Sequence, residues 1–270
     1  MEYRSLTDCL MTLKGSQGAK AAMFELAVDG PIARLTLDRP QTRNALRLDD
    51  WRVLIALVEQ ASRLKARVLL IESKVAGAFS AGIDLGDLAQ LHGDPALRLP
   101  FRNTMRAALD GIRRAPIPVV AAIDGACLGM GVALAAACDL RIAGPQASFA
   151  LPLARQGMAY PLEDIARLTG LVGEGQAARL LLTGTRIDAA EAVRIGLAEM
   201  AGADPRAVAD AIAGNAPGAL ALLKQGLGLA AAGAASDEGH ARAFDATFAS
   251  AEFAEGLAAR QARRAPDFSR

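Results

Sequence analysis

Two short glycine-containing loops are the first places in the sequence that could do chemistry. One reads KVAGAFSAGIDL (74–85), and the other is the turn LGMGV (128–132). Glycine lets a backbone approach a ligand closely, so each loop can present main-chain N–H groups to a carbonyl oxygen. No acidic residue lies between Asp124 and Asp139. The second loop can therefore stabilise developing charge through an amide, but a proton must come from elsewhere or not move at all.

Each loop follows an apolar segment that predicts a buried strand. These segments are RVLLIES (67–73) and VVAAID (119–124), and helices are predicted after them, near 97–113 and over about 130–138. The order strand, loop and helix occurs twice, which is typical of parallel-sheet α/β units. Ligands of such folds bind at the carboxyl ends of the strands, so we expect both loops at one edge of a sheet.

The remaining sequence predicts a hairpin before these units and helices after them. The hairpin is predicted over 24–28 and 32–37, and Asp49 and Asp50 are predicted to cap a helix over 51–64. From Glu163 the chain is predicted to be helical to its end, with helices over 163–171, 174–182, 188–195, 206–213, 217–230 and 237–263. Residues 1–22 are polar and irregular, which indicates a flexible extension before a core of 23–200 and a helical C-terminal region of 201–270.

Charge and cysteine content exclude several classes of partner. Thirty basic and 29 acidic residues give a net charge of +1 and are spread along the chain, so neither nucleic acid nor a membrane is an expected partner. No apolar run reaches the roughly 18 residues expected of a membrane span. Cys9, Cys127 and Cys138 form no metal-ligand spacing, so no metal site is predicted, and their odd number indicates a reducing, cytoplasmic location.

Four segments of the chain, in this order, resemble the crotonase superfamily, which includes the enoyl-CoA hydratases and isomerases. They are LDRPQTRNAL (37–46), GAFSAGIDL (77–85), PVVAAIDGACLGMGVALAAACDLRIA (118–143) and GLVGEGQAARLLLTGTRIDAAEAVRIGLA (170–198). The resemblance implies an α/β fold with a repeated ββα spiral core and a C-terminal helical trimerisation region. It also implies a homotrimer or a hexamer made of two trimers, an acyl-CoA thioester as the ligand, and no prosthetic group.

The family's shared device is an oxyanion hole made by two backbone N–H groups, and the matching motif positions are Ala81 and Met130. Both lie just before or at a predicted helix start, where unpaired N–H groups and the positive end of the helix dipole meet. One such donor is worth about 3–4 kcal/mol when a thioester carbonyl becomes enolate-like. The family commonly has glycine where Met130 stands, so a bulky side chain is expected in or beside the acyl pocket.

The two glutamates that hydratases of this family use are replaced in this sequence. Their motif positions fall on Ala133 and Leu153, neither of which can transfer a proton. A positioned acid or base contributes about 10²–10⁴-fold to a rate, so ordinary hydration of an enoyl-CoA is not expected.

Substitute proton carriers can be sought in the segment GMAYPLEDIARL (157–168). Tyr160 is a candidate proton donor, and Asp164 or Glu163 is a candidate base if this helix start faces the acyl pocket. The alternative is that the two acids only complement the helix N-terminus and that Tyr160 packs against it.

Residues for binding coenzyme A are implied by the same resemblance. The loop of Ala81, Gly82, Ile83 and Asp84 matches the family segment that cradles the cofactor portion of the substrate through backbone groups. Arg39 is a candidate partner for a CoA phosphate, with a solvated turn arginine as the alternative.

Two functions remain open on the sequence alone. The first is an isomerase or lyase that stabilises a thioester enolate, and decarboxylation of a malonyl-type thioester suits it because that reaction needs no strong base. The second is a non-catalytic acyl-CoA-binding or accessory protein that keeps the fold and the pocket. An ionisable side chain near the reacting carbons would favour the enzyme, and a wholly apolar pocket would favour the binder.

Overall fold

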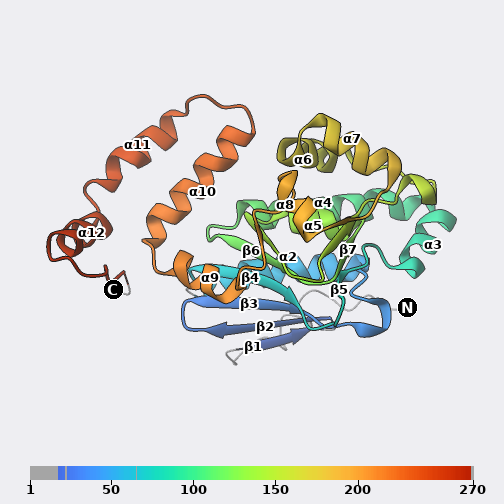
Figure 1. Cartoon of the computed structure of the whole chain (residues 1–270), viewed down its shortest axis with the longest axis horizontal. Coiled ribbons are helices and arrows are strands. Elements are labelled where there is room, and N and C mark those ends of the chain that lie inside the picture. The colour runs from blue at the N-terminus through green and yellow to red at the C-terminus, as the bar shows by residue number, and fades with distance from the viewer. Residues whose placement is uncertain (1–17, 22, 65, 269–270) are drawn as a thin grey trace.

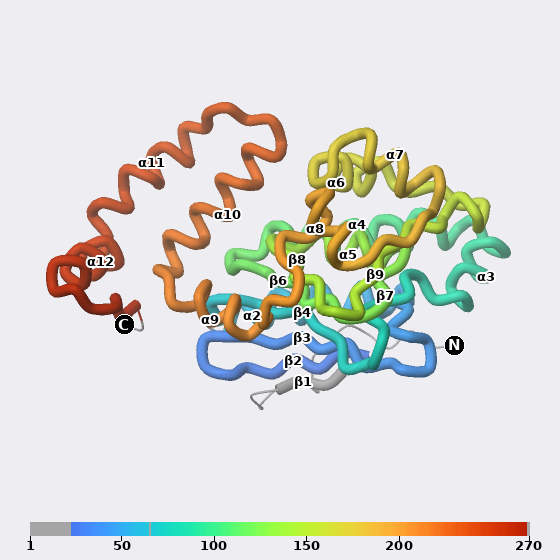
Figure 2. Tube along the Cα trace, in the orientation of Figure 1, coloured from blue at the N-terminus to red at the C-terminus, as the bar shows by residue number. Residues whose placement is uncertain are grey.

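The protein combines two β-sheets with a layer of helices, so the predicted α/β class is confirmed. The computed structural model describes residues 18–21, 23–64 and 66–268. In this part of the chain the helices between residues 48 and 194 lie over the sheets, and the helices between residues 217 and 261 extend to one side (Figures 1 and 2).

The larger sheet of the described chain has seven strands in the order β1-β2-β3-β4-β6-β8-β11. Their bounds are β1 Gly18–Ala21, β2 Phe24–Asp29, β3 Ile32–Leu37, β4 Val68–Ser73, β6 Val119–Ile123, β8 Leu140–Ala143 and β11 Met200–Ala201. The pairs β1-β2 and β2-β3 are antiparallel, and every pair from β3 to β11 is parallel. The loops after β4 and β6 therefore leave the sheet at the same edge, as predicted.

These two loops contain short strands that belong to a second sheet. Its order is β10-β9-β7-β5, with the bounds β5 Ala78–Ser80, β7 Ala126–Leu128, β9 Ser148–Ala150 and β10 Ile187–Asp188. Strand β7 pairs in parallel with both β5 and β9. Since β5 and β7 are neighbours, the glycine segments that follow them lie side by side.

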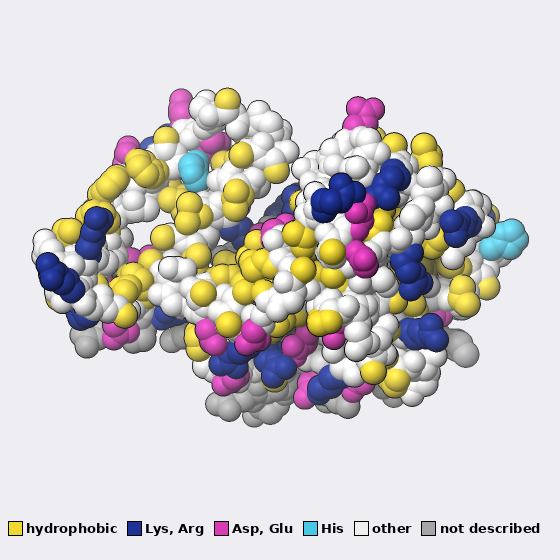
Figure 3. Space-filling view, in the orientation of Figure 1, with side chains coloured by type: hydrophobic (Ala, Val, Ile, Leu, Met, Phe, Trp, Pro, Cys, Tyr) yellow, Lys and Arg dark blue, Asp and Glu magenta, His cyan; other side chains and the backbone are white. Residues whose placement is uncertain are grey.

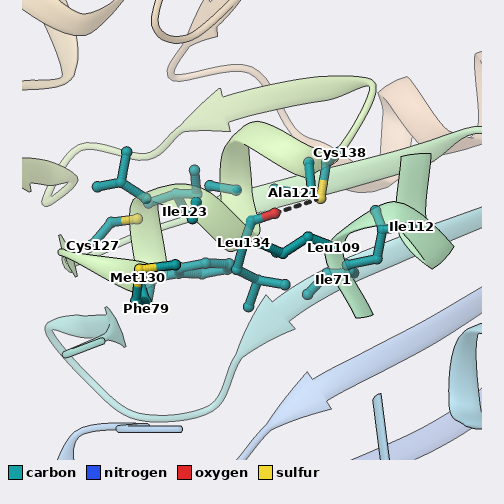
Figure 4. Packing of buried hydrophobic residues seen from close by; sticks show 14 of the residues in the cluster. Ile71, Phe79, Leu109, Ile112, Ala121, Ile123, Cys127, Met130, Leu134 and Cys138 are labelled. Carbon is teal, nitrogen blue, oxygen red and sulfur yellow. Dashed lines mark hydrogen bonds between the residues drawn. The ribbon is translucent and has the colours of Figure 1, made fainter. Parts of the chain in front are cut away.

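Helix α5 (Met130–Ala137) lies at the centre of the core, and all eight of its residues are buried. Leu134 lies among Leu109 and Ile112 of α4 (Arg98–Arg114) and Ala121 of β6 (Figure 4). A helix that is apolar on all sides belongs in a protein interior, which explains its alanine-rich sequence. The other helices of this layer are α2 Leu48–Arg63, α3 Leu85–Gly93, α6 Leu162–Val172, α7 Glu174–Thr183 and α8 Ala189–Arg194.

The C-terminal helices are joined to the core at two places. Helix α9 (Pro205–Ala213) covers the opposite face of the larger sheet, where Ala209 and Ala213 pack against residues of β3, β4 and β6. On α10 (Pro217–Ala231), the Nζ of Lys224 donates to the carbonyls of Ile112 at 3.1 Å and Ile117 at 2.9 Å. The same ammonium pairs with Oδ2 of Asp139 at 2.8 Å. The first helices of the region over 201–270 are therefore attached to the core.

Several predictions about elements are corrected by the structure. The chain after Glu163, predicted to be helical to its end, also contains the short strands β10 and β11. Residues 18–21 form the edge strand β1, so the predicted extension of 1–22 is not wholly irregular, and its residues 1–17 and 22 lie outside the described chain. Helix α2 begins at Leu48, because Asp50 accepts the Arg47 N–H at 2.8 Å from inside the first turn. The helix predicted over 237–263 is two helices, α11 (Glu238–Thr247) and α12 (Ala251–Gln261), since Ser250 caps a new start.

The described residues contain neither a membrane-spanning helix nor a cluster of metal ligands. None of their helices is both long and apolar enough to cross a membrane. The same part of the chain has no group of three His, Cys, Asp or Glu side chains placed to hold a metal ion.

Candidate active site

A cavity of about 390 Å³ lies where the loops that follow β5 and β7 meet. Residues of four segments line it: 41–45, 81–88, 128–130 and 152–158. Most of these side chains are apolar, and Gln41, Thr42 and Gln156 add uncharged polar groups. Asp84 is the one ionisable side chain among the described residues of the lining. The cavity therefore suits a largely apolar ligand with few polar atoms.

The amide of Met130 is one of two candidate hydrogen-bond donors in this cavity. Met130 is the first residue of α5, after Gly129 with a φ of +53°. The first N–H groups of a helix have no acceptor within the helix, and no acceptor for this one is found elsewhere in the described chain. The Met130 side chain is only 3% exposed and lies near Phe79 and Cys127 in the core (Figure 4). Met130 is nevertheless one of the residues that line the cavity.

The second donor is the amide of Ile83, which corrects the prediction of Ala81. The Ala81 N–H donates to the carbonyl of Arg43 at 2.9 Å, so it is not free for a ligand. The Gly82 carbonyl accepts from Leu46 at 2.7 Å, and the Asp84 N–H donates to the Leu46 carbonyl at 3.0 Å. In such a bridge the central residue points its own N–H away from the partner. The Ile83 N–H accordingly has no acceptor among the described residues.

Gly82 brings the two donors together. It has a φ of +93°, and a Cβ placed on it would lie 3.2 Å from the Met130 nitrogen and 2.8 Å from the Leu128 carbonyl oxygen. Only glycine adopts this conformation readily and leaves this space open. Two unpaired amides, one of them at a helix start, therefore meet at one wall of the cavity and can stabilise a single developing oxyanion.

The positions of the absent glutamates are apolar in three dimensions as well as in sequence. Leu153 lines the cavity, and Ala133 is buried within α5. The carboxylate of Asp84 is already engaged, because its Oδ1 accepts the Gly86 N–H at 2.9 Å and its Oδ2 lies 3.4 Å from Nε of Arg47. Asp84 thus caps α3, and no lining side chain is placed as a free acid or base.

Tyr160 was predicted as a proton donor, but the structure places it behind the cavity wall. The side chain is not part of the lining, and its hydroxyl donates to the Gly129 carbonyl at 3.4 Å. Burial raises the pKa of Tyr160 well above its ordinary value, so the hydroxyl keeps its proton. Tyr160 therefore supports the turn before Met130 instead of reaching a substrate.

Asp164 was predicted as a base, and it faces the wrong way for that role. Its side chain is 2% exposed. The Oδ1 atom of Asp164 lies 3.0 Å from Nη1 of Arg106 and 3.8 Å from Nη2 of Arg113. Burial raises the pKa of Asp164, while Arg106 and Arg113 oppose that shift. The carboxylate joins α6 to α4 and does not line the cavity.

Replacing Tyr160 with phenylalanine should have only a small effect on turnover. Tyr160→Phe removes one long hydrogen bond to Gly129 and keeps the ring in place, so kcat should change by less than about fivefold. Steady-state kinetics with an acyl-CoA substrate would measure this. A loss of about 10²-fold or more would restore Tyr160 as a proton carrier.

The prediction that Arg39 binds a phosphate is also wrong, because its guanidinium is paired with a carboxylate of the same chain. Its Nη1 and Nη2 donate to the two carboxylate oxygens of Asp50 at 2.6 and 2.8 Å, and Nη1 also donates to the Ala45 carbonyl at 3.0 Å. The hydrogen bond to Asp50 raises the pKa of Arg39. The side chain therefore does not bind a phosphate in this arrangement. The other predicted residues, Ala81, Gly82, Ile83 and Asp84, all line the cavity, and their binding of coenzyme A stays a prediction.

Comparison with known proteins gives a consistent result. The sequence model of the enoyl-CoA hydratase/isomerase family matches residues 28–270. Among curated proteins, one from Mycobacterium bovis named "Probable enoyl-CoA hydratase echA6" is 33% identical over 239 residues, which is 88% of this chain and 95% of that protein.

Solved structures show the same fold. An enoyl-CoA hydratase/carnithine racemase from Magnetospirillum magneticum superposes with a TM-score of 0.88 at 29% identity and covers 97% of this chain and 99% of its own. An enoyl-CoA hydratase from Bacillus anthracis has a TM-score of 0.82 at 27% identity, with coverages of 92% and 99%.

Proposed function

Because this chain belongs to the enoyl-CoA hydratase/isomerase family of the crotonase superfamily, we propose that it decarboxylates a malonyl-type acyl-CoA thioester. The observation that carries the proposal is the pair of unpaired amides, Ile83 and Met130, at a cavity whose lining has no free acid or base. Such a site stabilises charge on an oxygen but does not transfer a proton. Decarboxylation is the enolate-forming reaction with those requirements.

The amides would act on the thioester oxygen. The bond between the α-carbon and the carboxylate carbon breaks, CO₂ leaves, and the electron pair moves onto that oxygen as an enolate. The N–H groups of Ile83 and Met130 donate to the new oxyanion. Water then supplies a proton to the α-carbon, and the hydroxide left behind combines with the released CO₂ as bicarbonate, so the thioester product forms without help from a side chain.

The apolar lining contributes a second effect. No cation is present among the described lining residues to solvate a substrate carboxylate. A carboxylate held there loses hydration, whereas the enolate places its charge at the two amides. The site thus interacts more favourably with the transition state than with the bound substrate, which is the condition for a higher kcat.

Hydration and isomerisation fit the cavity less well. Both move a proton to or from carbon, and a positioned side chain supplies about 10²–10⁴-fold of such a rate. Ala133 and Leu153 cannot do this, and Tyr160 and Asp164 do not reach the cavity. The proposed reaction is therefore a lyase reaction with coenzyme A as part of the substrate and with no prosthetic group.

The proposal includes assembly as a homotrimer or as a hexamer of two trimers. The C-terminal helices support it, because they expose large apolar side chains, which Figure 3 shows as yellow patches on the projecting arm. These are Leu223, Leu227, Phe244, Phe248, Phe253 and Leu257, each at least 43% exposed. Contiguous apolar surface of this kind is typical of a protein interface.

A second candidate function is acyl-CoA binding without turnover. The mostly apolar lining, whose one carboxylate (Asp84) is already engaged, favours it, since such a pocket with two amides can hold an acyl thioester without reacting. This alternative keeps the same ligand class and the same contacts to the carbonyl, and it differs only in whether a product forms.

A substrate panel separates these functions. The purified protein is incubated with malonyl-, methylmalonyl-, crotonyl- and 3-enoyl-CoA, products are identified by mass spectrometry, and binding is measured by calorimetry. We expect loss of CO₂ from malonyl- or methylmalonyl-CoA and no hydration of crotonyl-CoA. Binding with no product from any compound would establish the carrier instead. Rapid hydration of crotonyl-CoA would show that a proton carrier has been overlooked.

A further inference from the structure

The hydroxyl of Ser80 lies at the junction of the two segments that carry the amide donors. Ser80 is the last residue of β5, is 0% exposed and is not part of the cavity lining. Its Oγ donates to the Asn44 carbonyl at 2.8 Å and accepts the Gly82 N–H at 3.2 Å. A single hydroxyl thus links the turn before α2 to the loop that presents Ile83.

The acceptor of the Ser80 hydroxyl is itself held in place. Asn44 is 0% exposed and has a φ of +57°, in the left-handed region that asparagine tolerates better than most residues. Its Nδ2 donates to the Phe79 carbonyl at 3.0 Å, and its Oδ1 accepts the Arg39 N–H at 2.8 Å. The Asn44 carbonyl therefore provides a fixed reference point for Ser80.

Ser80 also contacts the segment that carries the other donor. A Cβ placed on Gly131 would lie 3.0 Å from the Cβ of Ser80 and 3.2 Å from its Oγ. The first turn of α5 is therefore packed directly against this serine. Ser80 touches the residue before Ile83 and the residue after Met130, so its position relates one amide to the other.

We propose that Ser80 is a positioning residue that fixes the Ile83 and Met130 amides at the spacing required to hydrogen-bond one carbonyl oxygen. The inference rests on the proposed binding of a thioester carbonyl between these amides. Hydrogen bonds weaken steeply as their geometry departs from linear. Two donors must therefore be held within about 0.5 Å of the required positions to bind one oxygen together. Without the hydroxyl, the loop of Ile83 loses a tie to Asn44 and can shift relative to α5.

The test compares two ligands that differ only in the carbonyl oxygen. Butyryl-CoA is a thioester, and its thioether analogue S-butyl-CoA keeps the same chain and the same coenzyme A. The ratio of their affinities, measured by calorimetry, reports the contribution of the amide pair alone. We expect the wild-type protein to prefer the thioester, and Ser80→Ala to lower that preference by about threefold to tenfold. The affinity for the thioether should stay within about twofold of wild type.

A matched control removes another partly buried hydroxyl of the core. The Ser62 hydroxyl, on α2, donates to the Val58 carbonyl at 3.1 Å, and within the described chain it makes no hydrogen bond to the loops of Ile83 and Met130. Ser62→Ala should therefore keep the wild-type preference, even if it lowers stability. If Ser80→Ala does not fold, Ser80→Cys keeps the side-chain shape with weaker hydrogen bonding and is interpreted by the same ratio.

Two results would overturn the inference, and they have different meanings. A wild-type preference that is unchanged in Ser80→Ala would show that the serine does not position the amides, and the proposed function would stand. A wild-type protein that binds both ligands equally, or neither, would show that the amide pair does not receive a thioester carbonyl. The proposed function would then fail together with the inference.

Discussion

Gly82→Ala should reduce kcat/KM for the acyl-CoA substrate by about 10²–10³-fold, the loss expected when one oxyanion donor is displaced. The new methyl group would lie 2.8 Å from the Leu128 carbonyl oxygen and 3.2 Å from the Met130 nitrogen, both of which are backbone atoms that cannot rotate away. The residue also has a φ of +93°, which an L side chain rarely adopts. Either the Ile83 loop or the start of α5 must move, and the two amides then no longer meet at one oxygen.

The matched control for this variant is Gly77→Ala. Gly77 has a φ of +69°, but no atom lies within 4 Å of an added Cβ. It therefore reproduces the backbone strain of an alanine at positive φ without the collision at the amides. We expect kcat/KM to stay within about threefold of wild type, with thermal unfolding recorded for both variants. Equal losses of activity in the two would mean that strain, and not displacement of the donors, causes the effect.

Asp50→Ala should lower the free energy of unfolding by about 3–5 kcal/mol, the cost of leaving one member of a buried ion pair without its partner. The Asp50 side chain is 5% exposed and that of Arg39 is 13% exposed, so the charge left on Arg39 has little access to water. The same carboxylate accepts the Arg47 N–H at 2.8 Å and so also stabilises the start of α2. Urea denaturation followed by circular dichroism would measure the change.

An adjacent residue provides the control. Asp49 pairs with Arg52 at 2.8 Å on the same helix, but its side chain is 83% exposed. Exposed ion pairs contribute about 0–1 kcal/mol, so Asp49→Ala should change stability by less than about 1 kcal/mol. If Asp50→Ala were equally mild, Arg39 would be free to leave its present site, and its role as a phosphate ligand would have to be considered again.

The Met130 donor could be predicted from sequence because its signal is local. Glycines on both sides of a residue at the end of a strand and the start of a helix indicate a tight turn with an unpaired amide. The Ile83 donor could not be chosen in the same way. Which amide of its loop is free depends on bonds to Arg43 and Leu46, some forty residues earlier in the chain.

Contacts distant in sequence also explain why Tyr160 and Asp164 do not reach the cavity, although the sequence predicts them there. The sequence shows that both lie near a helix start, but the side of that helix facing the cavity is decided by α4. Arg106 and Arg113 of that helix attract the Asp164 carboxylate away from the cavity. Opposite charges distant in sequence give no local signal, so only the fold shows that they meet.

Long elements were predictable, and very short ones were not. The strands at 67–73 and 119–124 are apolar and flanked by polar residues, and both are found close to those limits as β4 and β6. Strands β5, β7 and β9 have three residues each. Three residues are too few for an alternating pattern, and these strands form because their neighbours in the second sheet supply the hydrogen bonds.

The buried ammonium of Lys224 bears on how the molecule opens when it unfolds. If helix α10 left the core, the Lys224 ammonium would lose its ion pair with Asp139 and its hydrogen bonds to two backbone carbonyls. We therefore expect α10 and the sheets to unfold as one cooperative unit. Helix α11 has no buried residue, and α12 has only Ala259. We therefore expect these two helices to have the lowest local free energies of unfolding, and in a single chain they should unfold first. The division between parts that open separately therefore lies after α10, well inside the helical C-terminal region.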